Sequence, residues 1–130
     1  MNVAVLRANV VAGSWDPEVF LGSRDLGHAP WWRAGDTAAG RVRSSAGFNL
    51  KIANAAVSSF LAEDVIRWME KNADALAELR AVGAELSIDF GVTVGTSEQF
   101  TASVVFSSSH IRRIADAGVS LSLSAYPAST

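Results

Sequence analysis

The sequence predicts an α+β domain in which one antiparallel or mixed sheet of about five strands carries one long and two short helices on one face. The first observation behind this prediction is a run of apolar residues at helical spacing over residues 60–82. The second is a strict alternation of apolar and polar side chains, clearest over residues 85–94, which is typical of a strand with one buried face. The third is size. A chain of 130 residues, 49% of them hydrophobic, fits one core, so we expect residues 1–130 to form a single domain.

The first predicted elements are a strand and a short helix. Residues 3–11 are rich in valine and alternate in polarity, which predicts a strand. Asp16 can cap a helix, and Pro17 suits the first helical position. We expect this helix to end near Gly27, because glycine there and Pro30 soon after both interrupt helices.

The middle of the chain predicts a loop, a second strand and the long helix. Residues 37–47 are small, polar and glycine-bearing, which favours a loop. Alternation over residues 48–52 predicts the second strand. Ser58 or Ser59 is expected to cap the long helix, and Gly83 to end it.

The long helix is the element against which we expect the rest of the chain to pack. At about 1.5 Å per residue it would extend roughly 35 Å, close to the full width of a domain of this size. Charged residues fall mainly between the residues of its apolar stripe, as in a helix with one face on the core. The stripe consists of Leu61, Val65, Trp68, Met69, Asn72, Leu76 and Leu79.

The C-terminal part of the chain predicts three strands and a helix. Residues 85–94 and 100–106 are expected to pair as a hairpin through the glycine-containing loop 95–99. Serines at positions 107–109 can cap a short helix before the last strand. Apolar residues alternate with serine over residues 119–125, which predicts that strand. At a sheet edge it would offer unpaired backbone groups to a second copy of the chain.

Composition and charge exclude several classes of function. The formal net charge of −2 argues against binding nucleic acid by phosphate neutralisation. The absence of cysteine excludes disulfides and thiolate metal sites. No apolar run approaches the ~20 residues of a membrane span, and Arg7 interrupts the apolar N-terminus, so we expect a cytoplasmic protein without a signal peptide. Only 18% of residues are charged, against about 25% in typical domains, which favours self-association.

Three short motifs and two later aromatic residues carry a family resemblance. Residues 16–19, 26–30 and 32–36 read Asp-Pro-Glu-Val, Leu-Gly-His-Ala-Pro and Trp-Arg-Ala-Gly-Asp. With Phe48 and Tyr126, they resemble the bacterial domain-of-unknown-function family four-two-seven-nine, which often has tryptophan where Phe48 stands. The resemblance implies an aromatic strand, a long helix and a β-rich C-terminal half. It implies no activity, cofactor or catalytic residue, and it loosely associates the chain with immunity proteins that neutralise toxins.

A cluster of tryptophan and arginine is the most suggestive candidate for a binding site. Two adjacent indoles cannot both face the core of a regular strand, so one is expected to lie exposed beside guanidinium groups, as a stacking or anion-binding surface. The structural alternative is that one indole fills the end of the core and the other covers it, while the aspartate forms a turn. The candidate ligand-binding residues are Trp31, Trp32, Arg33, Asp36, Arg41 and Arg43.

No group of residues has the spacing of a catalytic or metal site. The two histidines, His28 and His110, lack a second ligand at metal-binding spacing. His110 with Arg112 and Arg113 could meet an anion at a helix start, or form a solvated first turn. No Gly-x-Ser-x-Gly motif surrounds the serines before His110. We therefore expect neither cofactor nor metal, and an enzyme is not favoured.

Two functions follow from these observations. The favoured one is a non-catalytic protein-interaction domain, of the immunity type or a homodimer formed through an exposed strand edge. An acidic surface around Glu70 and Asp74 could also recognise a basic protein partner. The alternative is a small-molecule or anion-binding protein, or an enzyme, with a pocket around the Trp-Trp-Arg-x-Gly-Asp segment. Neither nucleic acid nor a membrane is an expected partner.

Overall fold

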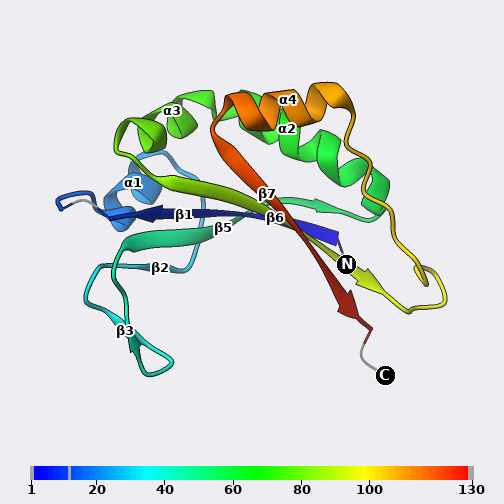
Figure 1. Cartoon of the computed structure of the whole chain (residues 1–130), viewed down its shortest axis with the longest axis horizontal. Helices are drawn as coiled ribbons and strands as arrows, with labels where there is room; N and C mark the ends of the chain where they lie inside the picture. The colour runs from blue at the N-terminus through cyan, green and yellow to red at the C-terminus, as the bar shows by residue number, and fades with distance from the viewer. Residues whose placement is uncertain (1, 12, 129–130) are drawn as a thin grey trace.

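The computed structural model describes residues 2–11 and 13–128, and it confirms the predicted α+β class (Figure 1). These residues form a five-stranded sheet of order β2-β5-β1-β6-β7 and a separate two-stranded sheet, β3-β4. No helix of the described residues is long and apolar enough to cross a membrane. In chain order the elements are β1 (Asn2–Val10), α1 (Pro17–Ser23), β2 (Trp31–Trp32), β3 (Thr37–Ala38), β4 (Arg41–Val42), β5 (Ala46–Ala55), the 3-10 turn η1 (Ser58–Phe60), α2 (Leu61–Lys71), α3 (Ala73–Ala81), β6 (Glu85–Val94), α4 (Ser108–Asp116) and β7 (Val119–Pro127).

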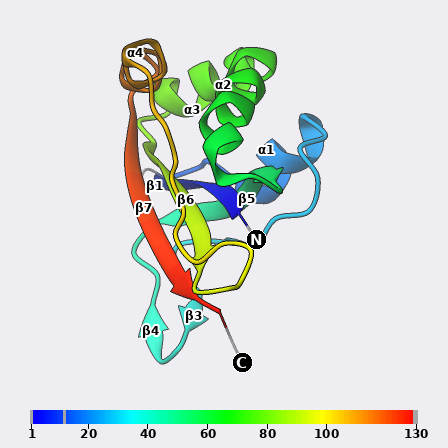
Figure 2. The same cartoon turned by 90° about the vertical axis from the view of Figure 1, so that its right-hand side faces the viewer.

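The large sheet is mixed. Strand β1 pairs antiparallel with β5 on one side and with β6 on the other, whereas β7 runs parallel to β6. A parallel pair needs a crossover connection, and here α4 lies in that connection. The helices lie on one side of the sheet and the β3-β4 hairpin projects from the other side (Figures 1 and 2). The sheet therefore has one covered face and one open face.

The core lies between the covered face and α2, α3 and α1. Phe48 on β5 is fully buried, as are Ile88 and Phe90 on β6 and Leu61 and Val65 on α2. Burial of side chains of this size stabilises the fold by about 1.5–3 kcal/mol each. The alternation that predicted strands at residues 3–11 and 85–94 reflects this core, because every second side chain faces it.

The first helix begins as predicted and ends earlier. The Asp16 carboxylate accepts a hydrogen bond from the Glu18 backbone N–H at 3.0 Å, and Pro17 occupies the first turn. The helix ends at Ser23, before the predicted stop at Gly27. Gly27 instead adopts a φ of +90°, a conformation that favours glycine, in the loop that leads to β2.

The single long helix predicted over residues 60–82 is wrong, because the segment is two helices that meet at Asn72. The Asn72 side-chain amide donates to the Trp68 carbonyl at 2.9 Å, the same carbonyl that accepts from the Asn72 backbone N–H at 3.0 Å. Asparagine competes with the helix for backbone partners in this way, and the Asn72 φ and ψ of −114° and 29° leave the helical region. Both helices still cover the sheet, so the layer arrangement is unchanged.

The hairpin predicted between residues 85–94 and 100–106 is also wrong, because β7 occupies the place beside β6. Residues 95–107 contain no regular element. Val104 and Phe106 nevertheless pack against the core, and the Phe106 ring meets the Phe90 ring edge-on at 4.8 Å between centroids. Alternation at 100–106 therefore reported the core contacts of Val104 and Phe106, but it failed for Phe100, which is 76% exposed, and it said nothing about pairing of the backbone.

The last helix and strand lie where the sequence predicted them. The Ser107 side chain accepts from the His110 N–H at 3.1 Å, which caps α4. The predicted loop 37–47 contains the small β3-β4 hairpin, and β5 begins at Ala46 instead of Phe48. Strand β7 forms one edge of the large sheet, with no described strand on its outer side.

Candidate functional site

Trp31 and Trp32 form β2, a two-residue strand at the opposite edge of the sheet. Trp31 pairs with Phe48, and Trp32 pairs with Gly47. Successive side chains on a strand point to opposite faces, so Trp31 packs against the core beside Phe48 while Trp32 lies on the open face. Both indoles are half-buried. The two rings therefore lie on opposite faces of the sheet, and neither is exposed in the way the sequence analysis expected of one of them.

Trp32 packs closely on the backbone of β5. A Cβ atom at Gly47 would lie 2.8 Å from Trp32 Cζ2 and would overlap the Ala8 carbonyl oxygen, so only glycine fits beneath this ring. The Arg43 guanidinium lies 4.3 Å from the ring centroid of Trp32, in a cation–π contact. Trp32 Nε1 is buried and has no hydrogen-bond partner among the described residues. The ring thus anchors the loop that carries the β3-β4 hairpin.

Arg33 and Asp36 fix the chain around β2. The Arg33 guanidinium lies 4.5 Å from the Trp31 ring centroid and donates to carboxylate oxygens of Asp16 and Glu18 at 3.1 Å. The hydrogen bond from Arg33 lowers the pKa of Asp16 below its ordinary value. The Asp36 carboxylate accepts from the Arg33 backbone N–H at 2.7 Å, as expected for a turn. The Arg33 guanidinium is therefore already paired with two carboxylates.

Arg41 and Arg43 line a different hollow from the tryptophans. It is an open cleft of about 630 Å³ along the β3-β4 hairpin, bordered by Val42, Ser44 and Ser45 among others. The structure thus brings Trp31 together with Arg33, Trp32 with Arg43, and Arg43 with Arg41, but it does not gather the six candidate residues around one pocket. No cluster of His, Cys, Asp or Glu in residues 2–11 and 13–128 has the arrangement of a metal site.

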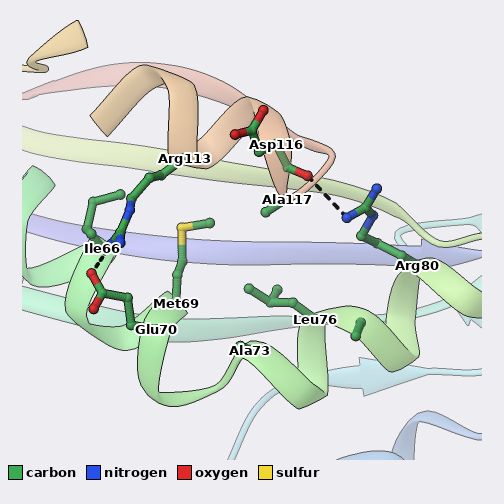
Figure 3. Close-up of a pocket in the computed structure, with 10 residues that line it drawn as sticks. Ile66, Met69, Glu70, Ala73, Leu76, Arg80, Arg113, Asp116 and Ala117 are labelled. Carbon is green, nitrogen blue, oxygen red and sulfur yellow. Dashed lines mark hydrogen bonds and ion pairs between the residues drawn. The ribbon is translucent and has the colours of Figure 1, made fainter. Parts of the chain in front are cut away.

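A groove between α4 and the α2-α3 pair was not predicted. It has a volume of about 390 Å³ and an apolar floor that includes Ile66, Met69 and Leu76 (Figure 3). Arg113 from α4 forms an ion pair with Glu70 of α2 at one end. At the other end Arg80 donates to the Asp116 carbonyl oxygen at 3.1 Å. Sequence reasoning missed the groove because its two walls, from residues 66–80 and 113–117, are far apart in the chain.

Polar contacts hold α4 on α2. The Ser107 backbone N–H donates to His110 Nδ1 at 3.2 Å, so the proton of the neutral ring resides on Nε2. His110 Nε2 then donates to Glu63 Oε2 at 2.8 Å. Ile114 is the buried side chain of this helix. His110 therefore positions the helix, and the predicted anion site at its start is already occupied by a carboxylate of α2.

The serines of β7 fix that strand to β6 on the open face of the sheet. The Ser122 and Ser124 hydroxyls donate to Asp89 Oδ1 at 2.9 and 2.8 Å. Asp89 is only 6% exposed, and its other oxygen lies 3.9 Å from an Arg7 nitrogen. A buried carboxylate needs such partners. Ser122 and Ser124 therefore hold β7 on β6.

On the covered face of β7, Val119 is buried in the core, but Leu121 and Leu123 are not covered by the helices. Leu121 is 39% exposed and Leu123 is 61% exposed, although both lie on the covered face of the sheet. Figure 2 shows β7 along one margin of the molecule, beyond most of α2 and α3. None of its nine residues is charged, and its only proline, Pro127, is the last residue. The strand lacks the lysines, bulges and inner prolines with which proteins usually protect an edge.

The opposite edge of the sheet is protected. Strand β2 has only two residues, and the part of β5 beyond it carries Lys51. Short edge strands and lysine both hinder pairing with another chain. The two edges of the sheet therefore differ, and among the described residues no strand pairs with the outer side of β7. Comparisons with known protein families, curated proteins and solved structures found no match to this chain.

Proposed function

We propose that this chain is a non-catalytic protein-interaction domain that binds its partner along the free edge of β7. The observation that carries the proposal is an uncharged nine-residue edge strand with exposed leucines. Its outer backbone groups can donate and accept hydrogen bonds to an added strand, while the leucines supply apolar contact. This mode of binding needs no reactive side chain.

A substitution at Leu123 tests the proposal. Leu123→Lys places a charge on the edge, which opposes strand addition. We expect this variant to lose a partner that the wild-type chain captures from lysate of the source cells. Val42→Lys is the matched control, because Val42 is 70% exposed on β4, outside the large sheet. Equal capture by the wild type and both variants would overturn the proposal.

Anion binding in the cleft that Arg41 and Arg43 line is the second candidate function. The cleft supports it because two guanidinium groups and the hydroxyl-bearing Ser44 and Ser45 border one hollow. Titration with inorganic phosphate, followed by amide chemical shifts, tests this candidate. We expect shifts around residues 38–45 that are lost in Arg41→Ala. Phosphate that causes no saturable shift in the wild type would exclude it.

A further inference from the structure

We propose that the partner on β7 is a second copy of this chain, paired antiparallel about a two-fold axis at the middle of the strand. This inference rests on the proposed function and adds the identity of the partner. Such pairing would join two sheets into one continuous sheet. If residue i of the first copy lies opposite residue j of the second, then residue j of the first also lies opposite residue i of the second, as two-fold symmetry requires.

The free backbone groups of β7 can be assigned from its pairing with β6. Pro127 is in register with Val94, and the Ala128 N–H donates to the Val94 carbonyl oxygen at 2.8 Å. In a ladder, every second residue directs its N–H and C=O to the same neighbour. The groups of Ser122, Ser124 and the other even-numbered residues therefore point to β6. Those of Leu121 and Leu123 point away from the sheet.

The side chains of β7 match themselves in this arrangement. With the axis at Leu123, that residue lies opposite its own copy, Leu121 lies opposite Ala125, and Ser122 lies opposite Ser124. Apolar side chains then meet apolar ones on the covered face, whereas on the open face Ser122 meets Ser124 and Ser120 meets Tyr126. An axis between two residues would place leucine opposite serine instead. The alternating pattern is therefore compatible with symmetric pairing.

The absence of charge on β7 favours a second copy over a foreign protein as its partner. Interfaces with foreign proteins commonly use charge complementarity to select the partner and to steer its approach. Strand β7 has no charged residue with which to select one, and it has none that would repel its own copy. Two further exposed apolar residues lie outside the strand: Val105 precedes α4, and Ile111 lies on α4. A stable pair needs about 800 Å² of contact per partner.

Light scattering after size-exclusion chromatography tests the inference. We expect the wild-type chain to show twice the monomer mass of 13.7 kDa at micromolar concentration. Leu123→Lys should be monomeric with an unchanged circular dichroism spectrum, whereas Val42→Lys should remain a dimer. A dimer that survives Leu123→Lys would overturn the inference.

A cysteine at the axis provides a second and independent test. The chain has no cysteine, so Leu123→Cys introduces the only thiol. Opposed residues of a hydrogen-bonded antiparallel pair have Cα atoms about 5.5 Å apart, within the range of a disulfide. We expect Leu123→Cys to form a covalent dimer on mild oxidation, and Val42→Cys to remain monomeric. Failure of Leu123→Cys to cross-link faster than Val42→Cys would contradict the pairing.

The outcomes separate this inference from the proposed function. A wild-type chain that stays monomeric at all concentrations, but captures a foreign protein in a manner that Leu123→Lys abolishes, overturns the second copy as partner and leaves the proposed function standing. A toxin would be such a foreign protein. If the wild-type chain is monomeric and captures the same proteins as Leu123→Lys, both the second copy as partner and the proposed function are overturned.

Discussion

Glycine at position 47 is required by the contact between β5, β1 and Trp32. We expect Gly47→Ala to lower the free energy of unfolding by about 1–3 kcal/mol, because the new Cβ would overlap the Ala8 carbonyl and the Trp32 ring. Urea unfolding measures the change. Gly22→Ala is the matched control: no atom lies within 4 Å of a Cβ there, and the residue is helical. Alanine at that position should raise stability by about 0.5–1 kcal/mol. Equal effects of the two changes would contradict the close packing at Gly47.

The ion pair between Asp16 and Arg33 predicts a dependence of stability on pH. The hydrogen bond from Arg33 holds the pKa of Asp16 below 3.8 in the folded chain. Its contribution to stability is therefore present above pH 3.8 and is lost as the pH falls through the lower folded pKa. Asp16→Asn keeps a capping side chain and removes the charge. We expect its melting temperature to lie below that of the wild type at neutral pH, and the difference to vanish well below pH 3.8. A difference that does not change with pH would show that the ion pair contributes nothing.

At the scale of single residues, the sequence predicted the caps at Asp16 and Ser107, but the predicted cap of the long helix by Ser58 or Ser59 is wrong, because both serines lie inside the turn η1 and no side chain caps α2. Asp16, Pro17 and Ser107 act through neighbours two or three residues away, so their roles can be inferred locally. The partners of Arg33 and Asp89 are distant in sequence and come together only in the folded chain. Residue types alone therefore grouped six candidate residues that the structure separates.

The position of α4 depends on polar contacts made by His110. This residue completes the cap with Ser107 and also reaches Glu63. We expect His110→Ala to reduce the free energy of unfolding by about 1 kcal/mol, as loss of a cap does. Amides of α4 should also exchange with solvent faster than in the wild type.

Arg112→Ala on the same helix is the control for His110→Ala. Arg112 is exposed and takes part in none of the ion pairs found among the described residues. An exposed substitution of this kind usually changes stability by less than about 0.5 kcal/mol. If both variants leave α4 exchange unchanged, the histidine does not hold the helix.

At the scale of elements, a regular periodicity of apolar residues did not by itself decide which helix or strand pair forms. The stripe over residues 60–82 has helical spacing throughout, yet the Asn72 side chain competes for the Trp68 carbonyl and divides it. Alternation over residues 100–106 was as regular as in true strands, but β7 was the better neighbour for β6. Periodicity reports which side chains face the core, and pairing depends on competition between distant segments.

At the scale of the molecule, the fold class followed from the sequence and the strand order did not. One apolar face along each strand requires a layer of helices, whichever strands are neighbours. The order β2-β5-β1-β6-β7 depends on contacts between residues far apart in the chain, such as Val10 with Ala46. The proposed function rests on that order, because it leaves β7 with a free edge and its two leucines exposed.

Residue-resolved amide exchange measures directly whether the edge of β7 is the binding surface. We expect the amides of Leu121, Leu123 and Ala125 to exchange rapidly in dilute wild-type protein and slowly at high concentration. The amides of Ser122 and Ser124, which pair with β6, should be protected at both concentrations. Addition of a captured foreign partner to dilute protein should protect the same three amides. Outer amides whose exchange rates respond to neither protein concentration nor partner would contradict binding along β7.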